Sequence, residues 1–294
     1  MHACGRRLAA FLATLAPGMA TVAMSGAAMA QDAPPVLAVP HPWQMGLQHA
    51  ESPVMQRITT LNNGVSIVIV IISIFVGILL LYVLGRFSAK KNPVASLVSH
   101  NSTLEVAWTL IPVLILVAIA IPSFRLVYYE DRTANPDMTI KVVAHQWYWE
   151  YQYPDQGGMH FDSYMVATEQ LTDEQKKLGL RQLAVDNQLV VPAGKNIRIL
   201  TTSSDVIHSF FIPSLGVQRY AIPGRTIETW VKVNQPGDYY GECNQICGMN
   251  HSFMPISIHA VSPEDFTAWV AQAKTKFSMT TPAQTTRLAL AAEH

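Results

Sequence analysis

Two long apolar stretches dominate the first half of the chain. Val65 to Leu84 and Val106 to Phe124 contain no charged residue, and each has about the ~20 residues that an α-helix needs to cross a ~30 Å hydrocarbon core. Pro112 and Pro122 fall inside the second stretch, where a membrane helix tolerates them. The pattern therefore predicts a transmembrane helix hairpin over residues 61–125, with spans at about 65–84 and 106–124. A buried hairpin in a soluble protein is the alternative interpretation.

The charges between the two stretches predict how the hairpin is oriented. Arg86, Lys90 and Lys91 lie in the short connection, opposed only by Glu105. Because short cytoplasmic loops carry the excess of basic residues, this connection is expected in the cytoplasm. Both outer ends of the hairpin then face the periplasm of a bacterial inner membrane.

The first thirty residues are typical of a secretory signal. Arg6 and Arg7 precede an apolar stretch, and Ala28-Met29-Ala30 forms a small-residue cleavage site. We expect residues 1–30 to be removed as a signal peptide, although a first membrane helix is an alternative. Residues 31–60 follow as a proline-rich, extended periplasmic segment.

The second half of the chain changes to short β-branched and aromatic runs separated by Gly, Pro, Asn and Asp. Such runs predict strands, at residues 138–145, 147–153, 187–191, 195–202, 226–233, 237–242 and 255–260. Many short strands in an exported segment favour a Greek-key sandwich or barrel. Ser262 and Pro263 then begin a C-terminal helix, so the domain spans 126–277, and 278–294 is a flexible tail.

The overall charge excludes one class of partner. The chain has 20 Lys and Arg against 20 Asp and Glu, a formal net charge of zero. A protein that neutralises nucleic-acid phosphates carries a basic surface instead. We therefore expect no nucleic-acid partner, and the lipid bilayer is the expected environment of the hairpin.

One loop concentrates soft metal ligands. Cys243, Cys247, His251 and Met254 lie within twelve residues, and His208 precedes them by thirty-five. Thiolate, imidazole and thioether are the donors of copper electron-transfer sites. The second cysteine exceeds what a mononuclear site needs, and two thiolates four residues apart can bridge two coppers. With two histidines, one methionine and one backbone carbonyl from the loop, six donors are available, which predicts a binuclear copper relay in a cupredoxin-like domain.

Three other interpretations of this loop remain open. A structural zinc could use His208, Cys243, Cys247 and His251, but would leave Met254 without a role. A disulfide between the two cysteines fits an oxidising compartment, but explains neither the histidine nor the methionine. The residues could also be unrelated.

A resemblance to a known family appears at the level of motifs. Two membrane helices followed by HQWYWEYQYP, FDSYM, DVIHSFFIPSLG, AIPGR and YYGECNQICGMNHSFMP resemble subunit 2 of the haem–copper cytochrome c oxidases. The resemblance covers roughly residues 61–273. It implies a membrane protein with a two-helix transmembrane hairpin followed by an all-β cupredoxin-like Greek-key domain. Its two-copper centre would take electrons from cytochrome c and pass them to the haem of subunit 1, where oxygen reduction is coupled to proton translocation.

The resemblance also assigns roles to residues. It implies a copper ligand set that consists of His208, Cys243, Cys247, His251, Met254 and the backbone carbonyl of Gln245. Trp147 matches the exposed aromatic residue that receives electrons, and Glu105 matches the carboxylate near the mouth of a proton pathway in subunit 1. Subunit 1, with its haem and second copper site, cytochrome c and other oxidase subunits are the implied partners.

Departures from the family pattern affect secondary features. The family usually has Glu at Gln245, where the side chain helps bind magnesium or manganese at the subunit 1 interface, so that metal is in doubt. Tyr220 replaces a common Asp. Residues 125–277 hold thirteen basic and sixteen acidic residues, a net charge of −3, which predicts a weakly acidic docking face for a basic cytochrome c.

Competing functions are a quinol oxidase subunit 2, which needs no copper, and a membrane-tethered copper-binding or copper-delivery protein. A structural zinc module is a third. The full ligand set argues against the first, and Trp147 within HQWYW has no role in the second.

Overall fold

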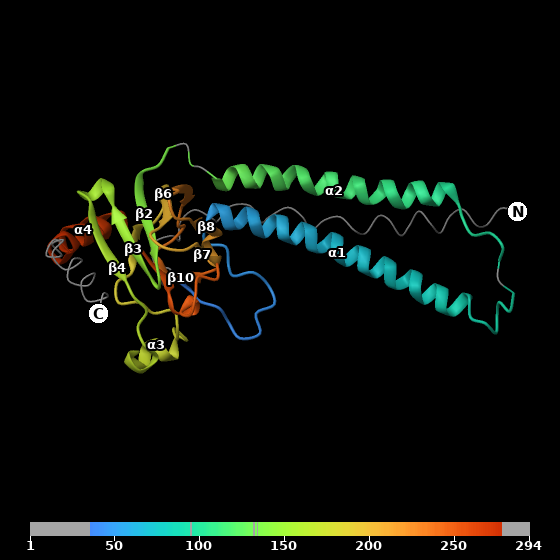
Figure 1. The fold of residues 1–294 in the computed structure, drawn as a ribbon, viewed down its shortest axis with the longest axis horizontal. Coiled ribbons are helices and arrows are strands. Elements are labelled where there is room, and N and C mark those ends of the chain that lie inside the picture. The colour runs from blue at the N-terminus through green and yellow to red at the C-terminus, as the bar shows by residue number, and fades with distance from the viewer. Residues whose placement is uncertain (1–35, 95, 132, 134, 278–294) are drawn as a thin grey trace, which may run out of the picture. The chain divides into compact units, whose positions relative to one another are not determined.

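The computed structural model describes residues 36–94, 96–131, 133 and 135–277. Two long helices precede two β-sheets and a C-terminal helix (Figure 1). The predicted signal peptide over 1–30 and the predicted flexible tail over 278–294 lie outside the described residues.

Two helices carry the apolar stretches, α1 (Pro53–Arg86) and α2 (Ser102–Asp131). Both are long and apolar enough to cross a membrane, and their most apolar parts are not buried inside the chain. At ~1.5 Å per residue each helix is about 45–50 Å long, whereas a hydrocarbon core is ~30 Å thick. The spans expected at 65–84 and 106–124 are therefore the middle parts of longer helices.

The segment expected to be extended over 31–60 needs a correction, because its last residues are helical. Ser52 has extended backbone angles, and its hydroxyl accepts a hydrogen bond from the Met55 N–H at 2.9 Å. Pro53 follows at the first helical position, where its missing N–H is not needed. These two residues begin α1 at residue 53. Earlier in the segment, β1 (Val36–Ala38) pairs with a strand of the β-domain.

Hydrogen bonds connect the outer ends of both helices to the β-domain. The Ser52 hydroxyl donates to the Leu215 carbonyl at 2.6 Å, and the Trp230 indole donates to the Tyr129 carbonyl at 2.8 Å. Gly216 adopts a positive φ of 65°, and a Cβ there would lie 2.8 Å from Ile58 Cδ1. This approach requires glycine, since only glycine has neither the steric penalty nor the side chain.

Two sheets form the β-domain. The first has the strand order β5-β11-β10-β7-β8, and β1 also pairs with β10; the second has the order β4-β3-β2-β6-β9. The first sheet contains β5 (Leu189–Pro192), β7 (His208–Ile212), β8 (Val217–Ala221), β10 (Gly237–Cys243) and β11 (Pro255–Val261). The second contains β2 (Met138–His145), β3 (Tyr148–Tyr153), β4 (Met159–Ser163), β6 (Ile197–Ser203) and β9 (Ile227–Val231).

All seven strands expected from the sequence are present, with ends shifted by up to two residues. The predicted order of two long apolar helices followed by an all-β domain is confirmed. Four strands were not expected: β1, β4, β7 and β8. Three of these strands, β1, β7 and β8, lack a clear alternation of buried and exposed residues. In β7 every residue but Phe211 is buried, so both faces of the strand are covered.

The core fills the space between the sheets. Trp149, Tyr151 and Tyr153 alternate along β3 and are fully buried. Trp149 packs edge-on against Phe210 of the other sheet, with 5.3 Å between ring centroids. The predicted C-terminal helix is α4 (Pro263–Phe277), which covers β4 and β5. A shorter helix, α3 (Asp173–Lys177), lies in the excursion between β4 and β5.

Candidate metal centre

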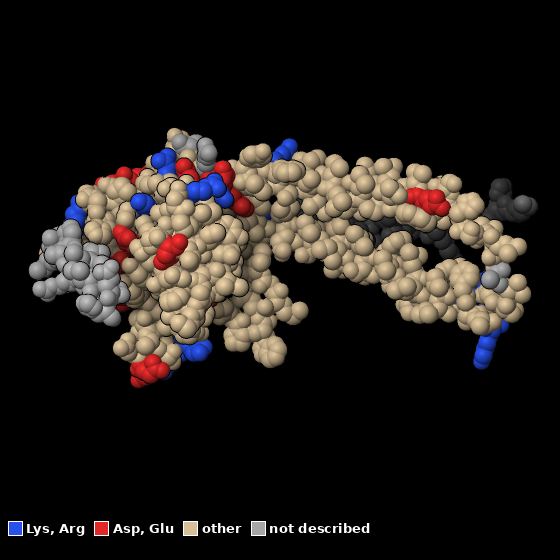
Figure 2. All heavy atoms as spheres, in the orientation of Figure 1, with Lys and Arg blue, Asp and Glu red and all other residues tan. Residues whose placement is uncertain are grey.

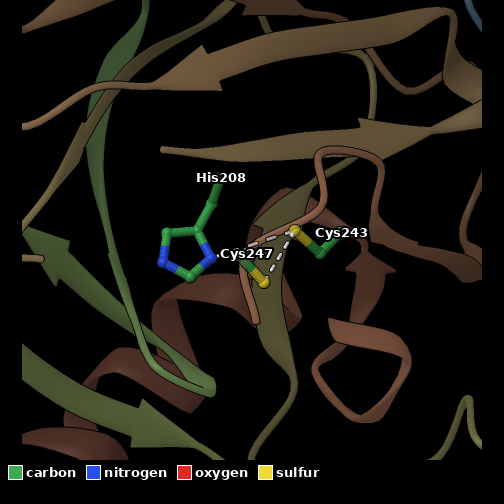
Figure 3. A group of neighbouring side chains, drawn as sticks. All are labelled: His208, Cys243 and Cys247. Carbon is green, nitrogen blue, oxygen red and sulfur yellow. Dashed lines mark hydrogen bonds between the residues drawn. The ribbon is translucent and has the colours of Figure 1, made fainter. Parts of the chain in front are cut away.

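Two loops at one end of the β-domain bring the expected metal ligands together. His208 is the first residue of β7, and Cys243 is the last residue of β10, which pairs with β7 at Phe210. The chain then runs through Cys247 to a short 3₁₀ turn that begins at His251. Met254 follows immediately before β11. Figure 3 shows the His208 ring directed at the two cysteine sulfurs.

Donor atoms surround the pair of sulfurs. The Cys243 and Cys247 sulfurs lie 3.9 Å apart, and both thiols are free. Around Cys243, His208 Nδ1 lies at 3.9 Å and the Gln245 carbonyl oxygen at 3.3 Å. Around Cys247, His251 Nδ1 lies at 3.5 Å and the Met254 sulfur at 3.7 Å. We call these six residues the candidate metal centre: His208, Cys243, Gln245, Cys247, His251 and Met254.

The donor set fits two coppers better than one zinc. A structural zinc takes four ligands in a tetrahedron, whereas six donors converge here, and the fifth and sixth are a buried thioether and a carbonyl oxygen. Met254 is only 1% exposed, so its sulfur is directed into the centre and not into solvent. Soft thiolates and thioether with imidazole are copper donors. Each sulfur has one imidazole nitrogen within 3.9 Å, which is the donor balance that a bridged pair requires.

Burial makes the centre costly to ionise without a metal. Desolvation, followed by the neighbouring Cys243 sulfur, raises the pKa of the Cys247 thiol to about 12. Burial also lowers the pKa of His208, against the effect of Asp205. Metal binding needs a neutral imidazole, and His208 is kept in that state. It also needs thiolates, so a metal ion that binds here must displace the thiol protons.

Asp205 fixes the orientation of the first histidine. Its carboxylate lies 2.9 Å from His208 Nε2, so Nε2 donates and Nδ1 presents its lone pair to the sulfurs, a pairing typical of metal-binding histidines. The same carboxylate accepts the Gln146 backbone N–H at 2.6 Å. Burial opposes ionisation of Asp205, but the bonds from His208 and from backbone N–H groups hold its pKa below the ordinary value.

Trp147 lies against the cysteine loop and is half-buried, which differs from the exposed residue expected from the sequence. Its indole N–H donates to the Cys247 carbonyl at 3.3 Å, and the Gln146 side-chain amide donates to the same oxygen at 2.8 Å. A Cβ at Gly248 would lie 2.9 Å from the indole ring. The indole is therefore one hydrogen bond away from a residue of the candidate metal centre.

Asp205 and Gln146 are site residues that the sequence reasoning missed. The spacing of Asp205, three residues before His208, is a usable signal, since a carboxylate so close can reach the imidazole. Gln146 gave no such signal, because its contact with Cys247 spans 101 residues. The buried indole of Trp149, a residue of β3 in the second sheet, also donates to the Met254 carbonyl at 3.0 Å.

One expected site residue, Glu105, lies apart from this cluster. Glu105 is exposed on the first turn of α2, beside a cavity lined by Ser102, Val106 and Thr109. The Gln245 side chain is half-buried, although its carbonyl belongs to the centre. Tyr220 is 46% exposed on β8.

Two protein-family descriptions match the chain. Residues 138–261 match the periplasmic domain of cytochrome c oxidase subunit II, and residues 40–126 match its transmembrane domain. Together they cover both the hairpin and the β-domain.

Individual relatives agree with this match. The probable cytochrome c oxidase subunit 2 of Rickettsia bellii is 48% identical over 232 residues, 79% of this chain and 85% of the relative. Cytochrome c oxidase subunit 2 of Oenothera berteroana is 45% identical over 78% of this chain and 90% of its own length. Among solved structures, the periplasmic domain of subunit II of cytochrome oxidase of Bradyrhizobium japonicum is 46% identical, with a TM-score of 0.45; the match covers 50% of this chain and 99% of that one.

Proposed function

Because the chain belongs to the cytochrome c oxidase subunit 2 family, we propose that its candidate metal centre holds a binuclear copper site with all six residues as ligands. The chain is the subunit of cytochrome c oxidase through which electrons reach subunit 1, and it is anchored in the membrane with its β-domain on the periplasmic side. The proposal concerns which of its residues perform this role.

One observation carries the proposal: six donors from two chain segments, His208 and the loop 243–254, converge around two sulfurs 3.9 Å apart. A copper pair held by these donors would accept and release one electron at a time. The chain itself holds the ligands in place. β10 and β11 fix both ends of the loop, Asp205 orients His208, and the buried Met254 side chain closes the centre to water. Ligands held this firmly move little when the metal charge changes.

The direct test is metal analysis and electron paramagnetic resonance of the full chain after copper reconstitution. We expect two coppers per chain that share one unpaired electron. A single zinc, or one isolated copper signal, would contradict the proposal. A Cys247→Ser variant is the matched control, since it keeps a polar side chain of similar size but removes one bridge, and we expect it to lose the shared-electron spectrum.

Trp147 is proposed as the residue that receives electrons from cytochrome c. Its hydrogen bond to the Cys247 carbonyl supports this role, because it connects the indole with a copper ligand by a short path. Trp147→Phe should slow electron transfer from cytochrome c more than tenfold while the copper spectrum stays unchanged. The control is Trp269→Phe, an indole on α4 that packs on Phe161 and Tyr153 away from the loop. Equal rates in both variants would remove Trp147 from the path.

An interface magnesium or manganese would meet a weaker ligand here than in relatives that carry glutamate. The Gln245 side chain offers only a neutral amide oxygen, and hard divalent cations prefer carboxylates. We propose that the oxidase binds this second metal with lower affinity than relatives that carry glutamate, and that Gln245→Glu raises this affinity. Manganese paramagnetic resonance of the purified complex checks this, and equal manganese in both forms would contradict it.

Glu105 is proposed to lie at the mouth of a proton pathway into subunit 1. Its exposure on the first turn of α2 supports this role, although a carboxylate there also stabilises the helix N-terminus. Glu105→Gln removes the proton-binding group but keeps the size. A pathway role predicts slower turnover with unchanged reduction of copper, whereas a purely structural role leaves turnover unchanged.

The remaining partners are proposed as cytochrome c, subunit 1 and the other oxidase subunits. A quinol oxidase subunit would need none of the six donors, and a copper-delivery protein would not need the Trp147 contact. The retained ligand set therefore favours the cytochrome c oxidase role.

A further inference from the structure

A cavity of about 980 Å³ lies between α1 and α2, in the half of the hairpin nearest the β-domain. Apolar side chains of both helices line most of it, including Val65 and Val68 of α1 and Ile115 and Ile119 of α2. All four are half-buried. Two basic residues, Arg57 and Arg125, line its outer end. We call this cavity the interhelical groove.

The two arginines are not neutralised by any acidic residue in the described part of the chain. The Arg57 guanidinium stacks on the Tyr129 ring, 3.6 Å from the ring centroid, and Arg125 lies one turn before Tyr129 on α2. Neither takes part in an ion pair among the parts of the chain that the structure describes. Both side chains are exposed. A stacked guanidinium keeps its N–H edge free, so two sets of donors face the same end of the groove.

The arginines mark the level of lipid headgroups. In α1 no charged residue follows Arg57 until Arg86, and in α2 none lies between Glu105 and Arg125. Figure 2 shows the middle of both helices without acidic or basic side chains on the visible face. The arginines therefore stand where the uncharged, membrane-spanning parts end on the outer side. Basic residues are usually depleted on that side, so a paired occurrence calls for a specific anionic ligand.

We propose that the interhelical groove binds an anionic phospholipid of the outer leaflet, with its phosphate held by Arg57 and Arg125 and an acyl chain along the apolar wall. Guanidinium groups bind phosphate oxygens through paired, charge-assisted hydrogen bonds. The groove is of the size that takes a lipid-like ligand. An apolar helix of another subunit would fill the wall but would offer no anion to the two guanidinium groups. Charge complementarity therefore selects the lipid.

Native mass spectrometry of the full chain in detergent tests the charged end. The chain is mixed with equal amounts of phosphatidylglycerol and phosphatidylcholine, which share acyl chains but differ in headgroup charge. We expect phosphatidylglycerol to be retained about tenfold more than phosphatidylcholine, and the double variant Arg57→Gln with Arg125→Gln to abolish this preference. Glutamine has nearly the helix propensity of arginine. The control is Arg86→Gln at the opposite end of α1, which should keep the preference.

A second variant tests the apolar wall without touching the charges. Gly64 lines the groove, and a Cβ there would meet no atom within 4 Å, so Gly64→Leu fits the helix and fills the groove. We expect it to lower retention of both lipids at least fivefold. Gly77→Leu is the matched control, because Gly77 has the same open surroundings but does not line the groove.

The assembled oxidase decides between a lipid and other occupants. A phosphatidylglycerol with a photoreactive acyl chain should label peptides that contain Val68 and Ile119, and Gly64→Leu should remove the label. Absence of labelling in the complex would mean that protein fills the groove, and would overturn the proposal. Equal retention of both lipids by the wild type, or release of phosphatidylglycerol by millimolar inorganic phosphate, would overturn it as well.

Discussion

The Asp205 carboxylate connects His208 of the candidate metal centre with the backbone of Gln146. One oxygen accepts from His208 Nε2, and the other accepts from the backbone N–H of Gln146, next to Trp147. The residue therefore positions both a proposed ligand and the indole that lies on the loop. Its negative charge would lie close to copper held by His208, where it would favour the more positive, oxidised state.

Asp205→Asn should raise the reduction potential of the copper centre, on the order of tens of millivolts, because a nearby negative charge is removed. The amide oxygen still accepts a hydrogen bond, so both coppers should stay bound. Redox titration of the copper-loaded chain measures the shift. Asp155→Asn is the matched control, since Asp155 caps a backbone N–H at Thr139 away from the centre. An unchanged potential in Asp205→Asn would refute the electrostatic role.

The sequence was enough to select the proposed ligands, but not their supporting contacts. Cys243, Cys247, His251 and Met254 are close in the chain, so spacing alone places them in one loop. Gln146, by contrast, reaches the loop only because two sheets pack face to face, and its bond to Cys247 spans 101 residues. Local patterns do not record such packing.

At the scale of elements, the approach of α1 to the β-domain depends on Gly216. A side chain there would meet Ile58 Cδ1 at 2.8 Å and the Met55 backbone at 3.0 Å, and φ is positive at 65°. Both a steric contact and a backbone preference thus oppose any other residue.

Gly216→Ala should lower the free energy of unfolding by about 2–4 kcal/mol, the sum of left-handed strain and overpacking. Gly194→Ala isolates the first contribution, because Gly194 has φ 76° but no atom within 4 Å of its Cβ position. We expect that variant to lose only about 1 kcal/mol. Thermal unfolding of the chain in detergent gives both values. Equal losses would show that the contact with α1 contributes nothing.

A histidine–aspartate pair across β10 and β11 makes the stability of the first sheet dependent on pH. His259 Nδ1 lies 2.7 Å from Asp238 Oδ1, and this bond raises the pKa of His259 although burial opposes it. A raised pKa means that the stabilisation is complete below the unfolded value of about 6.5 and is lost as pH rises through the folded value.

His259→Gln should therefore cost stability below about pH 6 and become equal to the wild type at pH 8. The difference should stay within about 1 kcal/mol, since the side chains are 43% and 34% exposed and solvent screens the pair. Unfolding measured from pH 5.5 to 8 checks the trend. A constant difference across this range would exclude protonation of His259 as the cause.

Alternation between buried and less buried positions accompanies some of the strands that were predicted. β2 and β6 alternate and were expected, with β2 matched residue for residue. The polar β8 and the fully covered β7 do not alternate, and only their mutual pairing makes them strands. The start of α1 was missed for another reason. The prolines of residues 31–60 suggested an extended segment, whereas Pro53 is the first residue of the helix.

At the scale of the whole molecule, the β-domain carries little net charge for a protein that we propose receives electrons from a basic cytochrome c. Residues 125–277 hold thirteen basic and sixteen acidic residues. The acidic groups are also engaged: Asp155, Asp186 and Asp205 each accept backbone N–H bonds. These three charges are therefore fixed in position by the fold.

Oxidation of a basic cytochrome c by the assembled oxidase should therefore depend weakly on ionic strength. Charge steering raises association rates and makes them sensitive to salt, and a net charge of −3 supplies little of it. Steady-state rates between low and high salt should differ by less than about tenfold. Gln152→Glu with Ser204→Asp adds two acidic residues and should steepen the dependence. A steep fall in the unmodified enzyme would contradict this expectation.

The Cys247 carbonyl, which accepts bonds from both the Gln146 amide and the Trp147 indole, has a consequence for biogenesis. A loop fastened by its neighbours keeps its shape before any metal arrives, unlike a zinc finger that folds only around its ion. Membrane insertion and folding can then be completed first. The proposed coppers can be added last, when they replace the thiol protons in a loop that is already folded.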